Sequence, residues 1–196
     1  MTWTDYVKHA AELSRDEFKE VLTVYRSTRP FGDKEHRRET DSRAGSISPQ
    51  KVYGVPVALM FFEGSRRLVE ADVTVPGLRA GDPNRIVVEA YPKILACKFG
   101  GAQTYKSDRK TKQTKAQYLV RKEIFGKITD DACRPDYGFL VEAASSLVDD
   151  PTGDELDALL CAIQAAWSWT KREENYGAPR SFDSLEGWIA DPSLRI

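Results

Sequence analysis

Acidic side chains gather in residues 149–157, which read Asp-Asp-Pro-Thr-Gly-Asp-Glu-Leu-Asp. The apolar residues that follow predict a helix whose first turns carry these carboxylates. In a helix that begins near Pro151, Asp150, Asp154 and Asp157 recur at offsets of four and seven residues and share one face. Clustered carboxylates repel one another, and a divalent cation would explain their concentration. One interpretation of the segment is therefore a metal site.

A second interpretation of the same segment needs no ligand. Acidic residues near the start of a helix offset its macrodipole, each contributing about 0.3 to 1 kcal/mol. Thr152 and Glu155 fit a Thr-x-x-Glu capping box, and Pro151 suits a first turn because that position needs no amide donor. Asp150 could itself be only a cap. The segment alone leaves metal binding and capping both open.

Basic residues gather in a second segment, 98–127, although the whole chain is nearly neutral. The 196 residues include 29 basic and 30 acidic ones, so the formal net charge of −1 neither requires nor excludes a nucleic-acid partner. Within the segment, nine basic residues stand against Asp108 and Glu123, a balance of +7. A basic patch together with an acidic site fits chemistry on phosphate bonds. The basic residues are Lys98, Lys106, Arg109, Lys110, Lys112, Lys115, Arg121, Lys122 and Lys127.

Composition narrows the class of protein further. The length predicts one domain over residues 1–196. Cys97, Cys133 and Cys161 lie far apart without a Cys-x-x-Cys pair, which argues against a structural zinc site. Apolar runs around Cys97 and Cys161 predict buried thiols. No stretch has the length of a membrane span or the form of a targeting segment, so we expect a cytoplasmic protein without a membrane partner.

The elements that would position these residues are mostly helical. Apolar spacing predicts opening helices at 3–11 and 15–25, with Ser14 as an N-cap. Residues 28–50 read as a long polar loop with at most short helical turns. The apolar run after the loop fits a strand or a helix, and Pro56 favours the helix because proline is tolerated in a first turn. Further helices are expected at 93–98, at 116–125 and from the acidic segment to Thr170.

The sequence predicts few strands. Residues 85–90, Arg-Ile-Val-Val-Glu-Ala, form the clearest buried strand, and it carries Glu89. Glu89 is either a carboxylate of a site or the buried partner of an arginine such as Arg121. A further strand is expected at 138–142. These strands are fewer than a sheet flanked by so many helices needs, so we expect the chain to lack part of its domain.

Four segments follow one another in a distinctive order along the chain. They are Arg37-Arg38-Glu39-Thr40-Asp41, Val87-Val88-Glu89-Ala90-Tyr91-Pro92, Tyr105-Lys106 and Asp154-Glu155-Leu156-Asp157-Ala158-Leu159-Leu160-Cys161-Ala162. In sequence, order and spacing they resemble an uncharacterised bacterial and archaeal family described as predicted ribonuclease H-like nucleases. The resemblance covers most of the chain, from about Trp3 to Pro192.

The resemblance implies an α/β fold of the ribonuclease H type, a mixed central sheet flanked by helices. By this analogy Glu89 is a strand carboxylate, Asp154 and Asp157 are a helix pair, and the three are catalytic ligands of Mg²⁺ or Mn²⁺. Two such ions about 3.5 to 4 Å apart would activate a water and stabilise the leaving oxygen of a nucleic-acid phosphodiester. The resemblance also implies residues that bind substrate phosphate, with Asp41 orienting an arginine. These are Arg37, Arg38, Asp41 and Lys106.

The chain departs from the family pattern before Trp3, where the family has a strand that carries an aspartate. We therefore expect a ribonuclease H-like domain that is incomplete at its N-terminus and helix-rich as a result. An exposed sheet edge would favour a homodimer. The predicted function is metal-dependent cleavage of nucleic acid, with this fragment possessing an incomplete metal site. The alternatives are a noncatalytic module that binds nucleic acid or a protein, and a helical structural protein whose acidic cluster only caps its helix.

Overall fold

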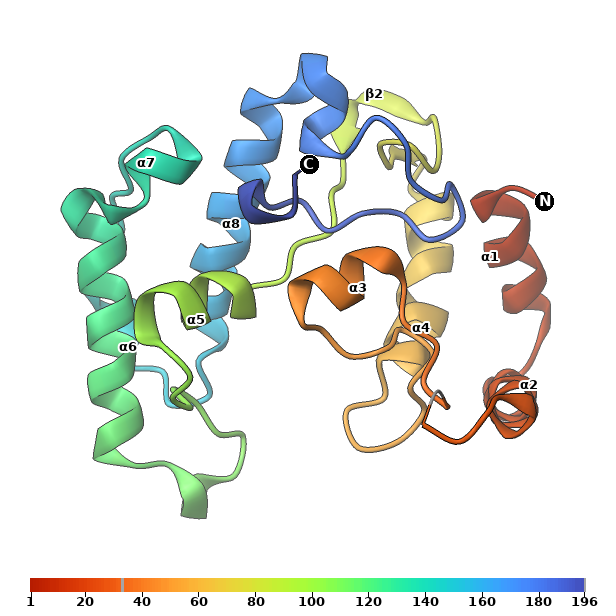
Figure 1. The fold of residues 1–196 in the computed structure, drawn as a ribbon, viewed down its shortest axis with the longest axis horizontal. Coiled ribbons are helices and arrows are strands. Elements are labelled where there is room, and N and C mark those ends of the chain that lie inside the picture. Colours follow the sequence, from red (N-terminus) through yellow and green to blue (C-terminus); the bar gives the residue numbers. More distant parts are fainter. Residues whose placement is uncertain (33, 196) are drawn as a thin grey trace. The chain divides into compact units, whose positions relative to one another are not determined.

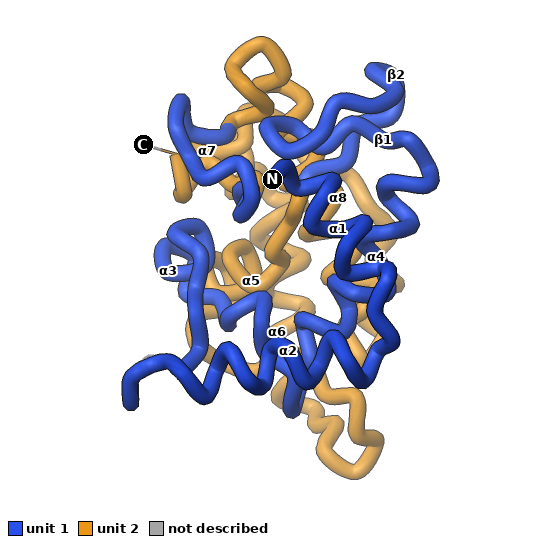
Figure 2. Tube along the Cα trace, turned by 90° about the vertical axis from the view of Figure 1, so that its right-hand side faces the viewer, with its two compact units in different colours: residues 1–88, 178–189 blue, residues 89–177, 190–196 orange. Residues whose placement is uncertain are grey.

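The computed structural model describes residues 1–32 and 34–195, which pack into two compact units (Figure 2). Unit 1 comprises Met1–Val88 and Ala178–Ile189. Unit 2 comprises Glu89–Gly177 and the segment from Ala190 onward. The segment after Gly177 therefore contributes residues to both units.

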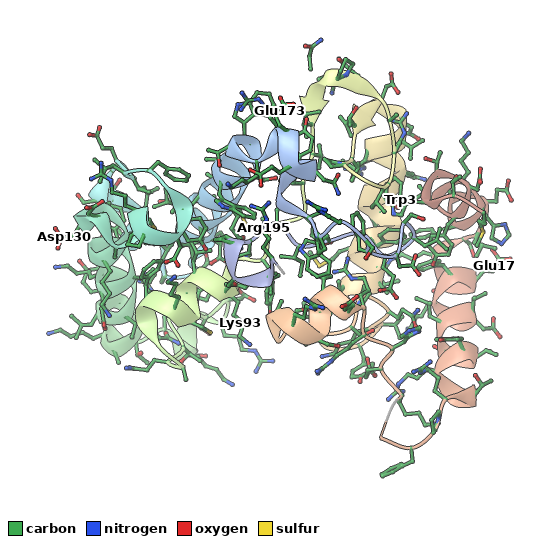
Figure 3. The ribbon with its side chains drawn as sticks, turned by 45° about the horizontal axis from the view of Figure 1, so that its top comes forward. Trp3, Glu17, Lys93, Asp130, Glu173 and Arg195 are labelled. Atoms are coloured by element: carbon green, nitrogen blue, oxygen red, sulfur yellow. The ribbon has the colours of Figure 1, made fainter. Side chains whose placement is uncertain are left out.

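Unit 1 opens with helices, as the sequence predicted. They are α1 (Trp3–Glu12), α2 (Arg15–Thr28), α3 (Glu39–Ala44) and α4 (Val57–Glu70) (Figure 1). Ser14 caps α2, because its hydroxyl accepts from Glu17 N at 3.3 Å while the Glu17 carboxylate accepts from Ser14 N at 2.7 Å. Glu17 is labelled at this end of α2 in Figure 3. Pro56 directly precedes α4, so the helix interpretation of that apolar run is confirmed.

The core of unit 1 lies where α1 and α2 pack on α4. Phe18 of α2 and Phe62 of α4 are both buried, with ring centroids 4.9 Å apart. Leu22 and Ala58 lie one turn away on the same faces and are also buried. Phe18, Leu22 and Phe62 each contribute roughly 1.5 to 3 kcal/mol when the side chain leaves water. This apolar contact holds the first two helices on the rest of the unit.

The prediction of a ribonuclease H-like mixed sheet is wrong. The described chain is mainly helical, and its sheet consists of two parallel strands, β1 (Val73–Thr74) and β2 (Asp82–Ile86). β2 starts three residues before the predicted strand 85–90, ends at Ile86 and contains Pro83, which has no N–H to give to a ladder. Hydrogen bonding between β1 and β2 ends where Val87 N donates to Thr74 O at 2.9 Å. Glu89 therefore lies beyond β2. Residues 138–142, the other predicted strand, are irregular.

Unit 2 is built from helices that the sequence largely predicted. They are α5 (Lys93–Gly100), α6 (Lys115–Lys127), α7 (Arg134–Tyr137) and α8 (Asp154–Thr170). Short 3-10 or π turns lie at Lys110–Lys112, Ile128–Ala132, Ser145–Val148, Arg172–Gly177 and Pro192–Leu194. α5 packs on both α6 and α8, around the fully buried Leu95, Ile124 and Leu160. On α8, Trp167 is buried and Trp169 is 54% exposed, because residues two positions apart on a helix do not share a face.

The segment after Ala190 is fixed to unit 2 by the carboxylate of Asp191, which is fully buried. Its Oδ2 accepts hydrogen bonds from Tyr137 Oη at 2.8 Å and from Gln164 Nε2 at 2.7 Å. Its Oδ1 accepts from the backbone and hydroxyl of Ser193. Gln164 in turn accepts from Tyr91 N at 2.8 Å. Each buried polar group in this network has a partner, so the network specifies where the segment sits on α8.

Replacing Asp191 with alanine should destabilise the protein by about 3 kcal/mol, because the buried donors of Tyr137 and Gln164 lose their acceptor. Urea unfolding followed by circular dichroism measures this loss. The matched control is Asp136→Ala, which removes an exposed carboxylate paired with Lys98 and should cost less than about 1 kcal/mol. Equal losses for the two variants would contradict a special role for the buried network.

Candidate functional site

The acidic helix α8 begins at Asp154, three residues later than the register assumed from Pro151. Gly153 precedes it in the left-handed conformation, with φ of 75°. Asp150 therefore lies outside the helix and shares no helical face with Asp154 and Asp157. The Thr152–Glu155 capping box and the first-turn placement of Pro151 are wrong for the same reason.

Asp150 instead caps the start of α8, the simpler of its two interpretations. Its carboxylate accepts from the backbone N of Thr152 at 2.9 Å, of Asp154 at 2.8 Å and of Glu155 at 3.2 Å. The Thr152 hydroxyl also donates to it at 2.6 Å. The hydrogen bonds from Thr152, followed by those from the amides of Glu155 and Asp154, lower the pKa of Asp150 to about 2.

This lowered pKa predicts a pH dependence of folding stability. The unfolded carboxyl titrates near 3.8 and the folded one near 2, so the stabilisation by Asp150 is complete above about pH 4 and is lost as the pH falls to about 2. Asp150→Asn removes the charge and should unfold with a shallower pH dependence in that window. Urea unfolding of both proteins from pH 6 down to about pH 2 tests it. Identical pH profiles for wild type and variant would show that the folded protein does not stabilise the ionised carboxylate of Asp150.

A cluster of polar side chains forms around Asp157, one turn into α8. Tyr105 Oη donates to Asp157 Oδ1 at 2.6 Å, and Lys106 Nζ donates to Asp157 Oδ2 at 2.5 Å. Burial, followed by the hydrogen bond to the Asp157 carboxylate, raises the pKa of Tyr105. Lys106 Nζ also lies 3.9 Å from Asp154, whose side chain is 79% exposed. The structure thus brings Lys106, Asp154 and Asp157 together, and both oxygens of Asp157 have partners from one short segment.

The segment that carries Tyr105 and Lys106 is held by side chains of α6. Arg121 is buried, and its guanidinium donates to Val148 O at 2.8 Å and to Tyr105 O at 2.7 Å. Gln117 Nε2 donates to Lys106 O at 3.2 Å. One of the two interpretations of Glu89 was the buried partner of Arg121; in the structure Arg121 donates to backbone carbonyls instead, and Glu89 is exposed. Arg121 fixes the position of Lys106 without contacting a carboxylate.

Gly153 lets Lys106 approach the start of α8. A Cβ at this position would lie 2.8 Å from Lys106 Cβ, closer than real carbon atoms pack, and the φ of 75° is strained for any other residue. The role of Gly153 follows from its conformation and was not predicted from the sequence.

Gly153→Ala should destabilise the protein by about 2 kcal/mol, because alanine is strained in the left-handed conformation and its Cβ would clash with Lys106. The matched control is Gly126→Ala in α6, where an added Cβ meets no atom within 4 Å. That substitution should stabilise the protein by up to about 1 kcal/mol, because alanine is the better helix former. Thermal unfolding of the two variants measures both signs, and a loss in Gly126→Ala as large as in Gly153→Ala would refute the argument.

Glu89, the predicted strand carboxylate, is exposed and begins unit 2. Its backbone carbonyl accepts from Ala190 N at 2.8 Å. Among residues 1–32 and 34–195, no three His, Cys, Asp or Glu side chains are grouped so that they could hold a metal ion. Asp154 and Asp157 lie about one turn apart on α8, and Glu89 does not form a metal-binding group with them. Binding of Mg²⁺ or Mn²⁺ by these three carboxylates stays a prediction.

Arg37, Arg38 and Asp41, the other predicted site residues, belong to unit 1. Arg38 donates through Nε and a terminal nitrogen to the two oxygens of Asp41, at 2.8 and 2.9 Å. Asp41 is 2% exposed and also accepts from Ser46 Oγ at 2.6 Å. Burial raises the pKa of Asp41, but the hydrogen bonds from Arg38 and Ser46 outweigh it and hold the pKa below its usual value. Asp41 thus orients Arg38, while Arg37 is exposed.

The nine basic residues of positions 98–127 divide into those that pair with a carboxylate and those that do not. Lys98, Lys106 and Lys127 pair with Asp136, Asp157 and Glu123 respectively. Arg121 is buried and donates to backbone carbonyls, and the remaining five are exposed and have no ion pair with a carboxylate of the described residues. No acidic residue occurs between positions 109 and 122. These five residues, named the basic segment below, are Arg109, Lys110, Lys112, Lys115 and Lys122.

Three further observations bear on the class of protein. Cys97 is exposed, contrary to the prediction of a buried thiol, because it lies on the outer side of α5. None of the helices within the described residues is both long enough and apolar enough to cross a membrane. Comparison of the chain with protein-family models, curated proteins and solved structures finds no match.

Proposed function

We propose that this protein is a nucleic-acid-binding module that contacts phosphates through the basic segment of unit 2. The observation that carries the proposal is the set of five exposed cations between Arg109 and Lys122 that no carboxylate of the described chain neutralises. A polyanion would supply the missing negative charge. Phosphate contacts of this kind need no base-specific geometry, so the binding should be largely independent of sequence.

The position of these cations supports the proposal. Lys115 is the first residue of α6, and Lys110 and Lys112 lie in the turn just before it. The N-terminal end of a helix carries partial positive charge, and the first turn of α6 contains no acidic residue. Basic side chains at this end are electrostatically unfavourable for the helix alone. An anionic ligand would relieve that repulsion, which is a reason for such residues to occur there.

The contacts of Asp157 favour binding over cleavage. Both of its oxygens accept hydrogen bonds, one from Tyr105 and one from Lys106. A metal ion at Asp157 would have to displace the Lys106 ammonium from one of them. Metal-dependent cleavage of nucleic acid, which the family resemblance implies, stays a prediction. Binding without cleavage requires only the side chains that are already exposed.

The test compares lysines of the basic segment with lysines that are already paired. In the triple variant Lys110→Gln, Lys112→Gln and Lys115→Gln, affinity for labelled DNA should fall and the slope of log affinity against log salt should shrink by about 2 to 3, because each phosphate contact contributes roughly 0.7 to 0.9. Fluorescence anisotropy at several salt concentrations measures both quantities.

The matched control removes the same charge from Lys98, Lys127 and Lys171, each of which has a carboxylate partner. It should keep most of the salt slope. Failure of the wild-type protein to bind DNA or RNA at low salt would overturn the proposal. So would equal losses in the two triple variants, since those would reflect net charge alone.

A further inference from the structure

Unit 1 carries a surface of a different chemistry, in which an exposed tyrosine is surrounded by cations. The ring of Tyr53 lies in the loop before α4 and is 46% exposed. The guanidinium of Arg26 lies 5.0 Å from the ring centroid, and the ammonium of Lys51 lies 5.1 Å from it. An aromatic face that is open to solvent and flanked by cations is what single-stranded nucleic acid stacks on in many binding proteins.

The tyrosine is held in place by its hydroxyl. Tyr53 Oη donates to Glu35 Oε1 at 2.5 Å, and the same oxygen accepts from Arg26 Nε at 3.0 Å. Glu35 therefore joins the loop of Tyr53 to the last turns of α2. Because its hydroxyl is hydrogen-bonded to Glu35, the Tyr53 ring has a defined orientation before a ligand binds. This lowers the entropic cost of binding.

A second tyrosine, Tyr25, is the chain neighbour of Arg26. Tyr25 precedes Arg26, and its hydroxyl bonds with Nδ1 of His36, the residue after Glu35, at 2.7 Å. The Tyr25 and His36 rings are stacked, with centroids 6.0 Å apart, and Tyr25 is 36% exposed. The backbone at His36 is in turn fixed by Ser48, whose buried hydroxyl donates to His36 O at 2.5 Å.

The charge around these rings is positive. In the sequence between positions 25 and 53, basic residues outnumber acidic ones by seven to four, a formal balance of +3, and Arg38 and Arg43 pair with Asp41 and Glu39. Lys34 is tied to Ser27 O, and Arg37 is exposed without an ion pair to a described carboxylate. The other five basic residues are Arg26, Arg29, Lys34, Arg37 and Lys51.

We infer that Tyr53, with Tyr25, Arg26, His36 and Lys51 around it, binds single-stranded nucleic acid by stacking a base on the Tyr53 ring while the cations contact the adjacent phosphates. We name these five residues the tyrosine surface. The inference rests on the proposed function, that the protein binds nucleic acid, and adds to it the strandedness of the ligand. A base held in a duplex is already stacked on both faces and cannot cover the ring, whereas a base in a single strand can.

Relative strengths decide whether a base can replace the cation over the ring. An exposed cation–π contact is worth roughly two- to fivefold in an equilibrium constant. Stacking of one base on an aromatic side chain is worth about 5- to 150-fold. The Lys51 ammonium, on a flexible stem, can leave the ring and pair with a phosphate, so its favourable charge interaction is kept while the base gains the ring face.

The experiment measures binding of fluorescein-labelled oligothymidylate, a blunt DNA duplex of the same length and inorganic polyphosphate to the full chain. Tyr53→Leu should weaken oligothymidylate binding by about 5- to 150-fold and leave polyphosphate binding unchanged. Tyr53→Phe, which keeps the ring, should bind oligothymidylate nearly as the wild type does. The matched control is Trp169→Leu, which removes another exposed ring with an arginine over it, at 5.1 Å, and should change nothing.

A second measurement does not depend on a variant that folds. Ultraviolet irradiation of the wild-type protein with an oligonucleotide that contains 5-iodouridine should crosslink a peptide that includes Tyr53 or Tyr25, identified by mass spectrometry. Crosslinks confined to other peptides would overturn the inference.

The other outcomes separate the two proposals. If the wild type binds oligothymidylate and Tyr53→Leu binds it equally well, the tyrosine surface has no such role, while the basic segment keeps its own. If the wild type binds neither DNA nor polyphosphate, the proposed function itself fails. If polyglutamate competes with oligothymidylate as well as unlabelled oligothymidylate does, the surface takes an acidic protein segment and the inference is wrong.

Discussion

The buried guanidinium of Arg121 is the constraint on which the arrangement of unit 2 depends. A buried cation without acceptors would cost several kcal/mol, so the chain must supply acceptors around it. It does so with two backbone carbonyls, Tyr105 O and Val148 O, which come from the segments before α6 and before α8. One side chain of α6 therefore sets where both segments run. The position of Lys106 over Gly153, and the ion pair with Asp157, follow from that placement.

This arrangement gives the acidic start of α8 two separate electrostatic partners. Asp150 interacts with the amides of the helix end, and Asp157 interacts with the ammonium of Lys106. Two of the carboxylates that repel one another in the sequence are thus compensated locally. The five cations of the basic segment, which precedes α8 in the chain, have no such carboxylate partners among the described residues. Unit 2 consequently combines a neutralised acidic helix start with an exposed positive segment.

Local signals in the sequence predicted the helices well and the sheet poorly. Ser14 and Glu17 fixed the start of α2, and Pro56 fixed the start of α4, because capping and proline geometry involve only neighbouring residues. The apolar run around Val87 looked like a buried strand, yet whether such a run pairs depends on partners elsewhere in the chain, which periodicity does not report. Pro83 and the exposed positions of β2 limit its pairing to two strands.

The candidate site was predictable in part for similar reasons. Lys106, Asp154 and Asp157 were identified, and the structure places them together, but among the described residues Glu89 does not form a metal-binding group with them and Asp150 lies outside the helix. The error at Asp150 came from a helix start placed three residues too early. Gly153 and Arg121 act through a left-handed backbone and through carbonyl acceptors, neither of which leaves a residue pattern. The tyrosine surface depends on Glu35 and His36 meeting α2, a tertiary contact.

The segment after Gly177 has a consequence for the order in which the protein can be completed during synthesis. Ile189 N donates to Thr40 Oγ1 of unit 1, across 149 residues of sequence, and the next residue, Ala190, already belongs to unit 2. Neither unit can acquire its full set of contacts until this late segment has left the ribosome. The helices of unit 1, although made first, must therefore wait with part of their apolar surface uncovered, and a chain stalled before residue 178 would present that surface to chaperones and proteases.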